Sequence, residues 1–193
     1  VTDWIRETAD YFSEQGFCVV APDMLWRLEP NFSGDHRDAD QTETGRRYKQ
    51  LIDHDKAVDD IAAVVANLKS MSECNGKIGV TGFCTGGTLT YLAAARLEMD
   101  AAAAYYGTQI HEFLGEAKNI NCPAIFHMGD RDDRVPQDLP DRVRAAVAGM
   151  PNITTHLYEA GHAFAHSGRT DLYSAAASQQ AHARTFDLFN KLR

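Results

Sequence analysis

The sequence has 193 residues, a net charge of −8 and a pI of about 5.4. Apolar residues make up 44% and charged residues 24% of it, which is typical of a globular protein and excludes a disordered or fibrous chain. The acidic balance argues against nucleic acid or an anionic membrane surface as a partner, because both bind basic patches. Length and composition fit one domain, residues 1–193, with room for a sizeable core.

Signals for a leader, a membrane span or a disulfide framework are weak. No apolar run approaches the ~20 residues of a span, and no basic-then-apolar leader is visible. The four cysteines, Cys18, Cys74, Cys84 and Cys122, form no Cys-x-x-Cys pair. Free thiols indicate a reducing compartment, so we expect a cytoplasmic protein. The chain begins at Val1 almost directly in a helical pattern, and we expect an N-terminal segment to precede it.

The first third of the chain predicts two helices separated by a strand and a loop. Residues 3–15 have the spacing of an amphipathic helix, with Gly16 as its stop. The apolar run 17–21 predicts a buried parallel strand. Residues 27–43 are polar and punctuated by Gly and Pro, which predicts a long loop. Helical spacing then predicts a long helix over 47–71.

The remainder alternates short apolar strands with helices after a turn at Asn75-Gly76. Strands are predicted at 77–81, 101–106, 123–128 and 153–158, and helices at 86–97, 139–150 and 171–191. This alternation predicts the α/β class, with a mostly parallel sheet and helices on both faces.

Reactive side chains follow the predicted strands, where ligands bind in open α/β sheets. The first is Cys84, in the stretch Gly82-Phe83-Cys84-Thr85-Gly86-Gly87 between a strand and a helix. Gly-x-nucleophile-x-Gly is the pattern of a nucleophile elbow, whose glycines permit a sharp turn. The helix N-terminus would stabilise a thiolate and offer the Thr85 N–H to an oxyanion. Taken alone, the motif fits a buried cysteine equally well.

Aspartates and a histidine follow two later strands. Three aspartates, Asp130, Asp132 and Asp133, compete for the role of orienting a histidine. His162 lies in a short loop after the last strand and can act as a base. Nucleophile, acid and then histidine is the chain order of the α/β-hydrolase triad. The joint arrangement therefore favours Cys84 as a nucleophile.

A metal site is a less favoured alternative. His162 and His166 are four residues apart, which on a helix would place both on one face as zinc ligands. The segment contains two glycines in residues 161–168, however, and lacks the Glu of His-Glu-x-x-His. We therefore expect no metal and no other cofactor.

With Cys84, Asp132 and His162 in place, the sequence resembles the dienelactone hydrolase family along nearly its whole length. The Cys-for-Ser elbow is the most specific feature, since it separates that family from most α/β-hydrolases. The other similar segments are Arg6-Glu7-Thr8, Ala21-Pro22-Asp23-Met24, Gly76-Lys77-Ile78-Gly79, Tyr105-Tyr106-Gly107, Phe126-His127-Met128-Gly129, Val135-Pro136 and Tyr158-Glu159-Ala160-Gly161-His162-Ala163-Phe164.

The resemblance implies an α/β-hydrolase fold, and it selects Asp132, because the family places its catalytic Asp three residues before Val-Pro. It further implies that Cys84 attacks an ester or lactone carbonyl to give a thioester acyl-enzyme. His162 would support the thiolate and then activate water, while Asp132 orients His162. The oxyanion would be held by the Thr85 N–H and a second backbone N–H.

The first departure from the family pattern concerns the N-terminus. In the family, a strand ending in Glu-Ile-Phe-Gly or similar comes just before the residues that Val1 matches. Its Glu helps to activate the thiol, and the next residue supplies the second oxyanion N–H. We expect an N-terminal truncation, or another segment that supplies both groups. A chain that truly began at Val1 should have a damaged sheet and little activity.

The second departure concerns the substrate. Family members acting on dienelactone hold its carboxylate with two arginines. One lies four residues after the catalytic histidine, where this chain has His166 and a displaced Arg169. The other corresponds to Arg46 or Arg47, beside Tyr48. Histidine is a weaker, pH-dependent replacement for a guanidinium, so the expected substrates are small esters or lactones rather than dienelactone in particular.

Four aromatic residues, Trp26, Tyr48, Tyr105 and Phe164, are candidates to line the acyl pocket. Tyr105 fits the core equally well, and we assign Tyr106 to the core. Two alternatives remain for the function as a whole. One is a thioesterase or general carboxylesterase on the same triad, and the other is a catalytically impaired binding domain. We expect a small-molecule substrate, no nucleic-acid or membrane partner, and a monomer or small homo-oligomer.

Overall fold

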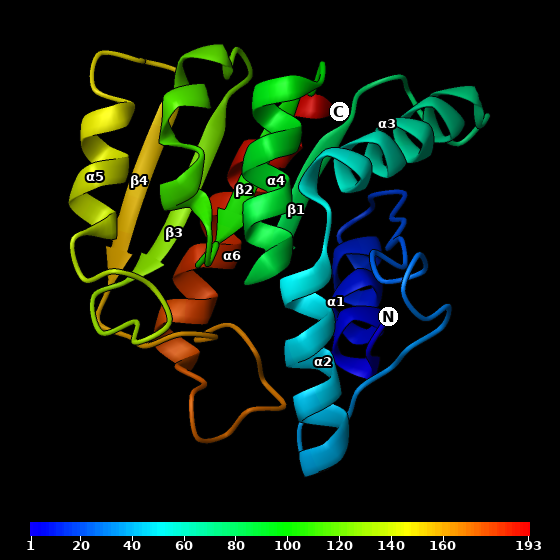
Figure 1. Cartoon of the computed structure of the whole chain (residues 1–193). Coiled ribbons are helices and arrows are strands. Elements are labelled where there is room, and N and C mark those ends of the chain that lie inside the picture. Colours follow the sequence, from blue (N-terminus) through cyan, green and yellow to red (C-terminus); the bar gives the residue numbers. More distant parts are fainter. The chain divides into compact units, whose positions relative to one another are not determined.

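A four-stranded parallel sheet, in the order β1-β2-β3-β4, organises the second part of the chain (Figure 1). The strands are β1 (Gly79–Phe83), β2 (Ala101–Tyr105), β3 (Ala124–Gly129) and β4 (Ile153–Tyr158). The computed structural model describes all 193 residues, whose contacts divide them into two units, Val1–Cys74 and Asn75–Arg193. All four strands predicted between residues 77 and 158 are confirmed, and no boundary is shifted by more than two residues.

Helices cover both faces of the sheet, as predicted. Figure 1 shows α4 (Thr85–Arg96) in front of the strands and α6 (Ala175–Phe189) behind them. The alternation along β3 gives the reason, since successive side chains of a strand point to opposite faces. Phe126 packs against Tyr91 of α4, whereas its neighbour His127 bonds to Thr185 of α6. The α/β class is therefore confirmed.

The core lies where β2 meets α4. All five residues of β2 are buried, and four of them are alanines. Small side chains on a strand let a helix approach the sheet closely, and α4 is itself buried from Gly87 to Ala95. An almost fully buried helix has no polar face, which sets α4 apart from the amphipathic helices elsewhere. The packing anchors the start of α4, where Cys84 lies.

The remaining helices of this unit are shorter or peripheral. They are α5 (Leu139–Ala146) and the 3₁₀ helices η1 (Ile110–Glu112), η2 (Leu114–Asn119) and η3 (Asn190–Leu192). The predicted helices at 86–97, 139–150 and 171–191 correspond to α4, α5 and α6. No helix in the structure is long and apolar enough to cross a membrane.

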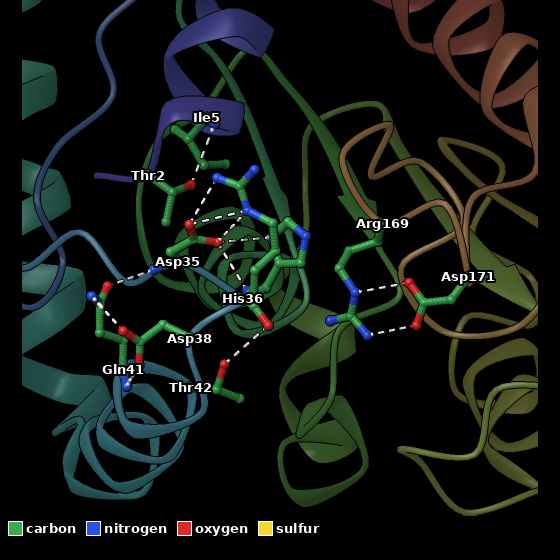
Figure 2. Close-up of polar contacts among 10 residues, drawn as sticks. Thr2, Ile5, Asp35, His36, Asp38, Gln41, Thr42, Arg169 and Asp171 are labelled. Carbon is green, nitrogen blue, oxygen red and sulfur yellow. Dashed lines mark hydrogen bonds and ion pairs between the residues drawn. The ribbon is translucent and has the colours of Figure 1, made fainter.

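The first unit contains three helices with side-chain caps. They are α1 (Asp3–Glu14), α2 (Ala39–Leu51) and α3 (His54–Ser70). The Thr2 hydroxyl accepts the Ile5 N–H at the start of α1 (Figure 2), and Gly16 follows its end with φ of 87°. A glycine with positive φ is a common helix terminator, so the predicted first helix and its stop are confirmed.

The predicted long helix over 47–71 is wrong in that two helices occupy the region. Asp53 separates them, because its carboxylate accepts the N–H groups of Asp55 and Lys56 and caps α3. Asp38 caps α2 in the same way (Figure 2), so the predicted loop over 27–43 ends five residues early. Aspartate at these positions satisfies backbone donors that no helical carbonyl can reach.

The predicted strand over 17–21 is also wrong, because these residues form no strand in the structure. A strand exists only when a neighbour accepts and donates its backbone hydrogen bonds. No strand lies within residues 1–74, and Val20 is 46% exposed. Apolar composition alone is therefore insufficient here.

Candidate active site

Cys84 occupies a strained turn between β1 and α4. Its φ and ψ are 57° and −117°, a region that a non-glycine residue adopts only when its surroundings impose it. Gly82 explains why the turn closes, since a Cβ at that position would lie 2.3 Å from the Gly86 carbonyl oxygen. The Gly-x-Cys-x-Gly stretch thus forms the sharp strand-to-helix connection that its sequence predicts.

Asp132 and His162 meet in a buried hydrogen bond. The Nδ1–H of His162 donates to Oδ2 of Asp132 at 2.9 Å, and the two side chains are 9% and 4% exposed. The other carboxylate oxygen accepts the Arg134 N–H at 2.9 Å. Both oxygens of Asp132 are therefore held, and its direction toward His162 is set by the loop.

The loops after β3 and β4 are joined by backbone contacts. A Cβ on Gly129 would lie 2.3 Å from the Ala160 carbonyl oxygen, so only glycine permits this approach. The Arg131 N–H donates to that same oxygen at 3.0 Å, and the Ala160 N–H donates to the Asp130 carboxylate at 3.0 Å. Asp130 thus ties the loops together, while Asp133 is exposed beside Arg134.

Cys84 is the second hydrogen-bonding partner of His162. Burial alone would lower the pKa of His162, but its hydrogen bonds and charge interactions with Asp132 and Cys84 raise that pKa to about 9. Hydrogen bonds therefore link the thiol of Cys84 to the imidazole of His162, and this imidazole to the carboxylate of Asp132. Such an arrangement can present a thiolate to an electrophile and transfer a proton through the imidazole.

The first turn of α4 supplies backbone donors beside Cys84. The N–H groups of Gly87 and Thr88 bond to the Cys84 carbonyl at 3.0 and 3.2 Å. Helix geometry leaves the earlier N–H groups, those of Thr85 and Gly86, without a helical acceptor. The Thr85 N–H therefore lies in the first turn of α4, directly after Cys84.

Two of the aromatic candidates lie deep in the second unit. Tyr105 is fully buried, and its hydroxyl bonds to Thr185 at 2.6 Å and to His182 at 3.0 Å on the α6 side of the sheet. This fits the alternative in which Tyr105 is a core residue. Phe164 is also fully buried and packs against Tyr158 and Tyr106.

The polar candidates after His162 are part of a turn-rich segment. The His166 N–H donates to the Ala163 carbonyl at 2.9 Å, so residues 161–168 form turns and no helix. Arg169 forms a two-point ion pair with Asp171, at 3.1 and 2.9 Å (Figure 2). Nowhere in the structure do three or more His, Cys, Asp or Glu side chains form a group that could hold a metal ion.

The other candidates belong to the first unit. The Trp26 indole donates to Asp60 at 2.9 Å. The Tyr48 hydroxyl bonds to Glu29, and the Arg47 guanidinium lies 5.3 Å from the centre of the Tyr48 ring. These contacts are all with other residues of the first unit.

Tyr106 is buried, as its assignment to the core predicts. The sequence did not predict that its ring also contacts the His162 imidazole edge-to-face, with the ring centres 5.1 Å apart. The chain has φ of 36° at this residue, and no local sequence signal marks a tyrosine that takes such a conformation. A cavity of about 10 Å³ borders Tyr106 and Asp132, which is far too small for an ester.

The parallel sheet with helices on both faces and the sharp strand-to-helix turn at Cys84 are those of the α/β-hydrolase class. The sequence model of the dienelactone hydrolase family matches residues 1–193, and the chain belongs to that family. It is accordingly a hydrolase of esters or lactones.

Curated relatives span the whole chain. It is 32% identical over 194 residues to carboxymethylenebutenolidase from Pseudomonas putida, covering 100% of this chain and 82% of that protein. Carboxymethylenebutenolidase 1 from Cupriavidus pinatubonensis is 31% identical over 193 residues, with the same coverage. The expected family is thereby confirmed.

Solved structures share the fold. A crystal structure of a proposed dienelactone hydrolase from Klebsiella pneumoniae aligns with a TM-score of 0.84 over 97% of this chain and 81% of its own, at 24% identity. A dienelactone hydrolase-like promiscuous phosphotriesterase from metagenomic libraries aligns at 0.72 over 98% and 81%, at 22% identity. At these identities the likeness concerns the fold.

Proposed function

We propose that the chain hydrolyses small esters or lactones with Cys84 as nucleophile, His162 as general base and acid, and Asp132 as the residue that orients His162. One observation carries this assignment. The imidazole of His162 lies between a buried carboxylate at 2.9 Å and the thiol of a strained elbow. A nucleophile within reach of a base that a third group orients is the signature of covalent catalysis, and ligands bind at this end of parallel strands.

The first half of the reaction forms a thioester. The Cys84 thiolate attacks the carbonyl carbon, and the carbonyl π electrons move to its oxygen. The tetrahedral intermediate then collapses, the C–O bond to the leaving alkoxide breaks, and the proton of His162 passes to that oxygen. For a lactone, the alcohol formed remains attached to the acyl group.

The second half returns the enzyme to its initial state. Neutral His162 takes a proton from water as the water oxygen attacks the thioester carbonyl. Collapse of this intermediate breaks the C–S bond, releases the carboxylic acid and restores the thiolate beside the imidazolium. Asp132 accepts the Nδ1–H throughout, which keeps the other ring nitrogen directed at the reacting atoms.

Backbone donors stabilise the charge that develops on the carbonyl oxygen. The Thr85 N–H is the donor we assign, because it lies at the positive end of α4 and has no helical acceptor. A second backbone N–H completes the oxyanion hole in this proposal. Donors of this kind are worth on the order of 10²–10³ in kcat.

Two polar residues that follow His162 in the chain support small esters or lactones as the substrate class. His166 stands where dienelactone-hydrolysing members of the family have an arginine, and Arg169 is engaged by Asp171. The Arg169 guanidinium is therefore already paired with a carboxylate of the protein, which weakens its attraction for a substrate carboxylate. This pairing favours, as a second candidate, a thioesterase or general carboxylesterase on the same triad.

We further propose a cytoplasmic location and a single functional domain. All four cysteines are free thiols, including the exposed Cys18, which a reducing compartment would preserve. The family match across residues 1–193 supports one domain.

Replacement of the nucleophile tests the mechanism. Cys84→Ala should abolish hydrolysis of an activated aryl ester while leaving the thermal unfolding midpoint nearly unchanged. Cys74→Ala is the matched control, because it removes a half-buried thiol outside the triad. Full activity of Cys84→Ala would exclude the thioester mechanism, and a folded, inactive wild-type protein would favour the binding-domain alternative.

Thiol labelling provides a test that does not depend on the choice of substrate. Near neutral pH, iodoacetamide should label Cys84 faster than the other three thiols, although Cys18 is more exposed. The reason is that a thiolate, rather than a thiol, is the reactive form. Faster labelling of Cys18 or Cys74 would contradict an activated Cys84.

A further inference from the structure

Strained backbone gathers around the triad. Four non-glycine residues have positive φ, namely Asn31, Cys84, Tyr106 and Ala163. Asparagine visits this region readily, but tyrosine does not. Cys84 and Tyr106 directly follow β1 and β2, and Ala163 directly follows His162. Strain of this kind persists where the surrounding structure determines a conformation, and it is common at functional sites.

The backbone of Tyr106 is held at the carboxyl end of β2. Its N–H donates to the His127 carbonyl at 2.8 Å, which extends the pairing of β2 with β3 by one residue. At φ of 36° the chain then turns away from the strand direction. The side chain is thereby directed to the triad, whereas Tyr105 points to the opposite face and meets α6.

The ring of Tyr106 forms a wall against His162. The centres of the Tyr106 and His162 rings lie 5.1 Å apart, and the two ring planes make an angle of 66°. The centres of the Tyr106 and Phe164 rings are also 5.1 Å apart, with an angle of 72° between the planes. Both are edge-to-face arrangements of the kind that aromatic rings prefer. Tyr106 is 3% exposed, so the ring has little freedom to move away.

The contact matters because the hydrogen bond to Asp132 does not by itself fix the orientation of the imidazole toward Cys84. The χ2 torsion of histidine is broad, so a ring bonded to Asp132 through Nδ1 alone can still tilt about that bond. A tilt would carry the other nitrogen away from Cys84. Contact with a rigid, immobile ring removes this freedom.

The Tyr106 hydroxyl contributes less than the aromatic ring to the orientation of His162. Its oxygen is buried and makes no hydrogen bond of good geometry, although the Ala165 backbone is nearby. Burial and the negative charges of Cys84 and Asp132 raise its pKa well above the usual value, so the phenol stays neutral. A neutral hydroxyl without a well-formed bond to a triad atom is poorly suited to proton transfer.

We propose that Tyr106 is a positioning residue of this hydrolase, whose ring holds the His162 imidazole in line between Asp132 and Cys84. The proposal rests on the triad proposed above and adds to it a fourth residue that acts through His162. It assigns the role to the aromatic ring and to the strained backbone that directs it, and it assigns no role to the hydroxyl.

Three variants of Tyr106 test the proposal. Tyr106→Phe keeps the ring and should retain kcat within about threefold. Tyr106→Met fills similar volume with a flexible chain, and Tyr106→Leu removes more of the wall. Both should lower kcat by roughly 10–100-fold with little change in KM, as expected for a misplaced catalytic group. Both should also alter the pH profile of Cys84 alkylation, because the imidazole–thiolate pair is loosened.

Tyr91→Leu is the matched control, since Tyr91 is a fully buried tyrosine on α4 that packs against Phe126. It should lower the unfolding midpoint without changing the alkylation profile. Equal loss of kcat in Tyr106→Phe and Tyr106→Met would overturn the assignment to the ring. Wild-type kcat and pH profile in folded Tyr106→Met would overturn the positioning role.

Cys84→Ala, assayed on the same ester, separates the two proposals. If Cys84→Ala is inactive while Tyr106→Met has full activity, the triad stands and the role of Tyr106 is excluded. If Cys84→Ala is fully active, both are excluded. Should Tyr106→Met and Tyr106→Leu fail to fold, the NMR signal of the His162 Nδ1–H in Tyr106→Phe decides. An unchanged signal supports a role for the ring, and its loss contradicts it.

Discussion

Histidine side chains within one unit of this protein reach opposite charge states. His162 differs in this way from His127 and His182. His162 has its pKa raised to about 9, whereas burial lowers the pKa of His182 to about 4 and that of His127 well below its usual value. Burial opposes the charge in all three. The difference is that only His162 has a carboxylate as a partner, so only there is the charged form favoured.

The histidines near α6 belong to a chain of hydrogen bonds whose direction is set by Arg184. A guanidinium can only donate, so Arg184 donates to the Tyr158 hydroxyl at 3.0 Å. Tyr158 can then direct its own proton to Nδ1 of His127, at 2.8 Å. We therefore assign Nδ1 of His127 as the acceptor and place the proton of the neutral ring on Nε2.

The chain continues to His182 in the same direction. Nε2–H of His127 donates to Thr185 at 3.1 Å, and Thr185 donates to Tyr105 at 2.6 Å. Tyr105 donates in turn to Nδ1 of His182 at 3.0 Å. A proton added to His127 or His182 would occupy an acceptor position and leave a buried hydroxyl without one. The two histidine environments therefore differ in hydrogen-bond direction as well as in charge.

Removal of the carboxylate should have the largest effect, because it makes His162 resemble the histidines near α6. Asp132→Asn should lower kcat on the order of 10²–10⁴-fold. It should also move the alkaline limb of the pH–rate profile below pH 9, since the hydrogen bond that raises the pKa of His162 is weakened. Measurements of kcat from pH 5 to 10 test this. Asp133→Asn, at an exposed position, is the control; similar losses in both variants would contradict the assignment of Asp132.

Interruption of the hydrogen-bond chain at its centre should affect stability and spare catalysis. Thr185→Val keeps the shape of the side chain but leaves Nε2–H of His127 without its acceptor and removes one of the two hydrogen-bonding partners of the Tyr105 hydroxyl. A buried unsatisfied group costs about 1–3 kcal/mol, so urea unfolding should show a loss of at least that size. Thr154→Val, at an exposed position of β4, should stay within about 0.5 kcal/mol. An unchanged stability of Thr185→Val would show that the chain contributes little.

The pKa shifts of His182 and His162 also predict a maximum of stability near pH 6.5. The pKa of His182 is about 4 in the folded protein against 6.5 unfolded, so its contribution is present above pH 6.5 and is lost as the pH falls toward 4. The pKa of His162 is about 9, so its contribution is present below pH 6.5 and is lost as the pH rises through 9. The free energy of unfolding should therefore decrease both below and above pH 6.5.

His182→Gln separates these two limbs. Glutamine still accepts from Tyr105 but does not titrate, so the acid limb should flatten while the alkaline limb stays. Denaturant titrations between pH 4 and 10 measure both. An acid limb of unchanged slope in His182→Gln would assign the acid sensitivity to other groups.

Secondary structure was most predictable where a segment finds its partners nearby in the chain. The α4 elbow follows from the glycines around Cys84, and the strands at 101–106 and 153–158 follow from apolar runs with turn signals. The run at 17–21 has the same composition, yet it forms no strand because none lies within its unit. The break at Asp53 required weighing a capping carboxylate against continuous helical spacing.

The sequence by itself determined the α/β class, the elbow at Cys84, the family and the chain order of the three proposed catalytic residues. These are properties of local patterns, since glycines, apolar periodicity and motif spacing act over a few residues. The family resemblance had already selected Asp132, and the tertiary structure shows its carboxylate bonded to His162. Only the tertiary structure decided that Tyr106 meets the His162 ring. It also decided that Tyr105 belongs to a core network. Those outcomes depend on the relative register and twist of strands far apart in the chain, which no local pattern specifies.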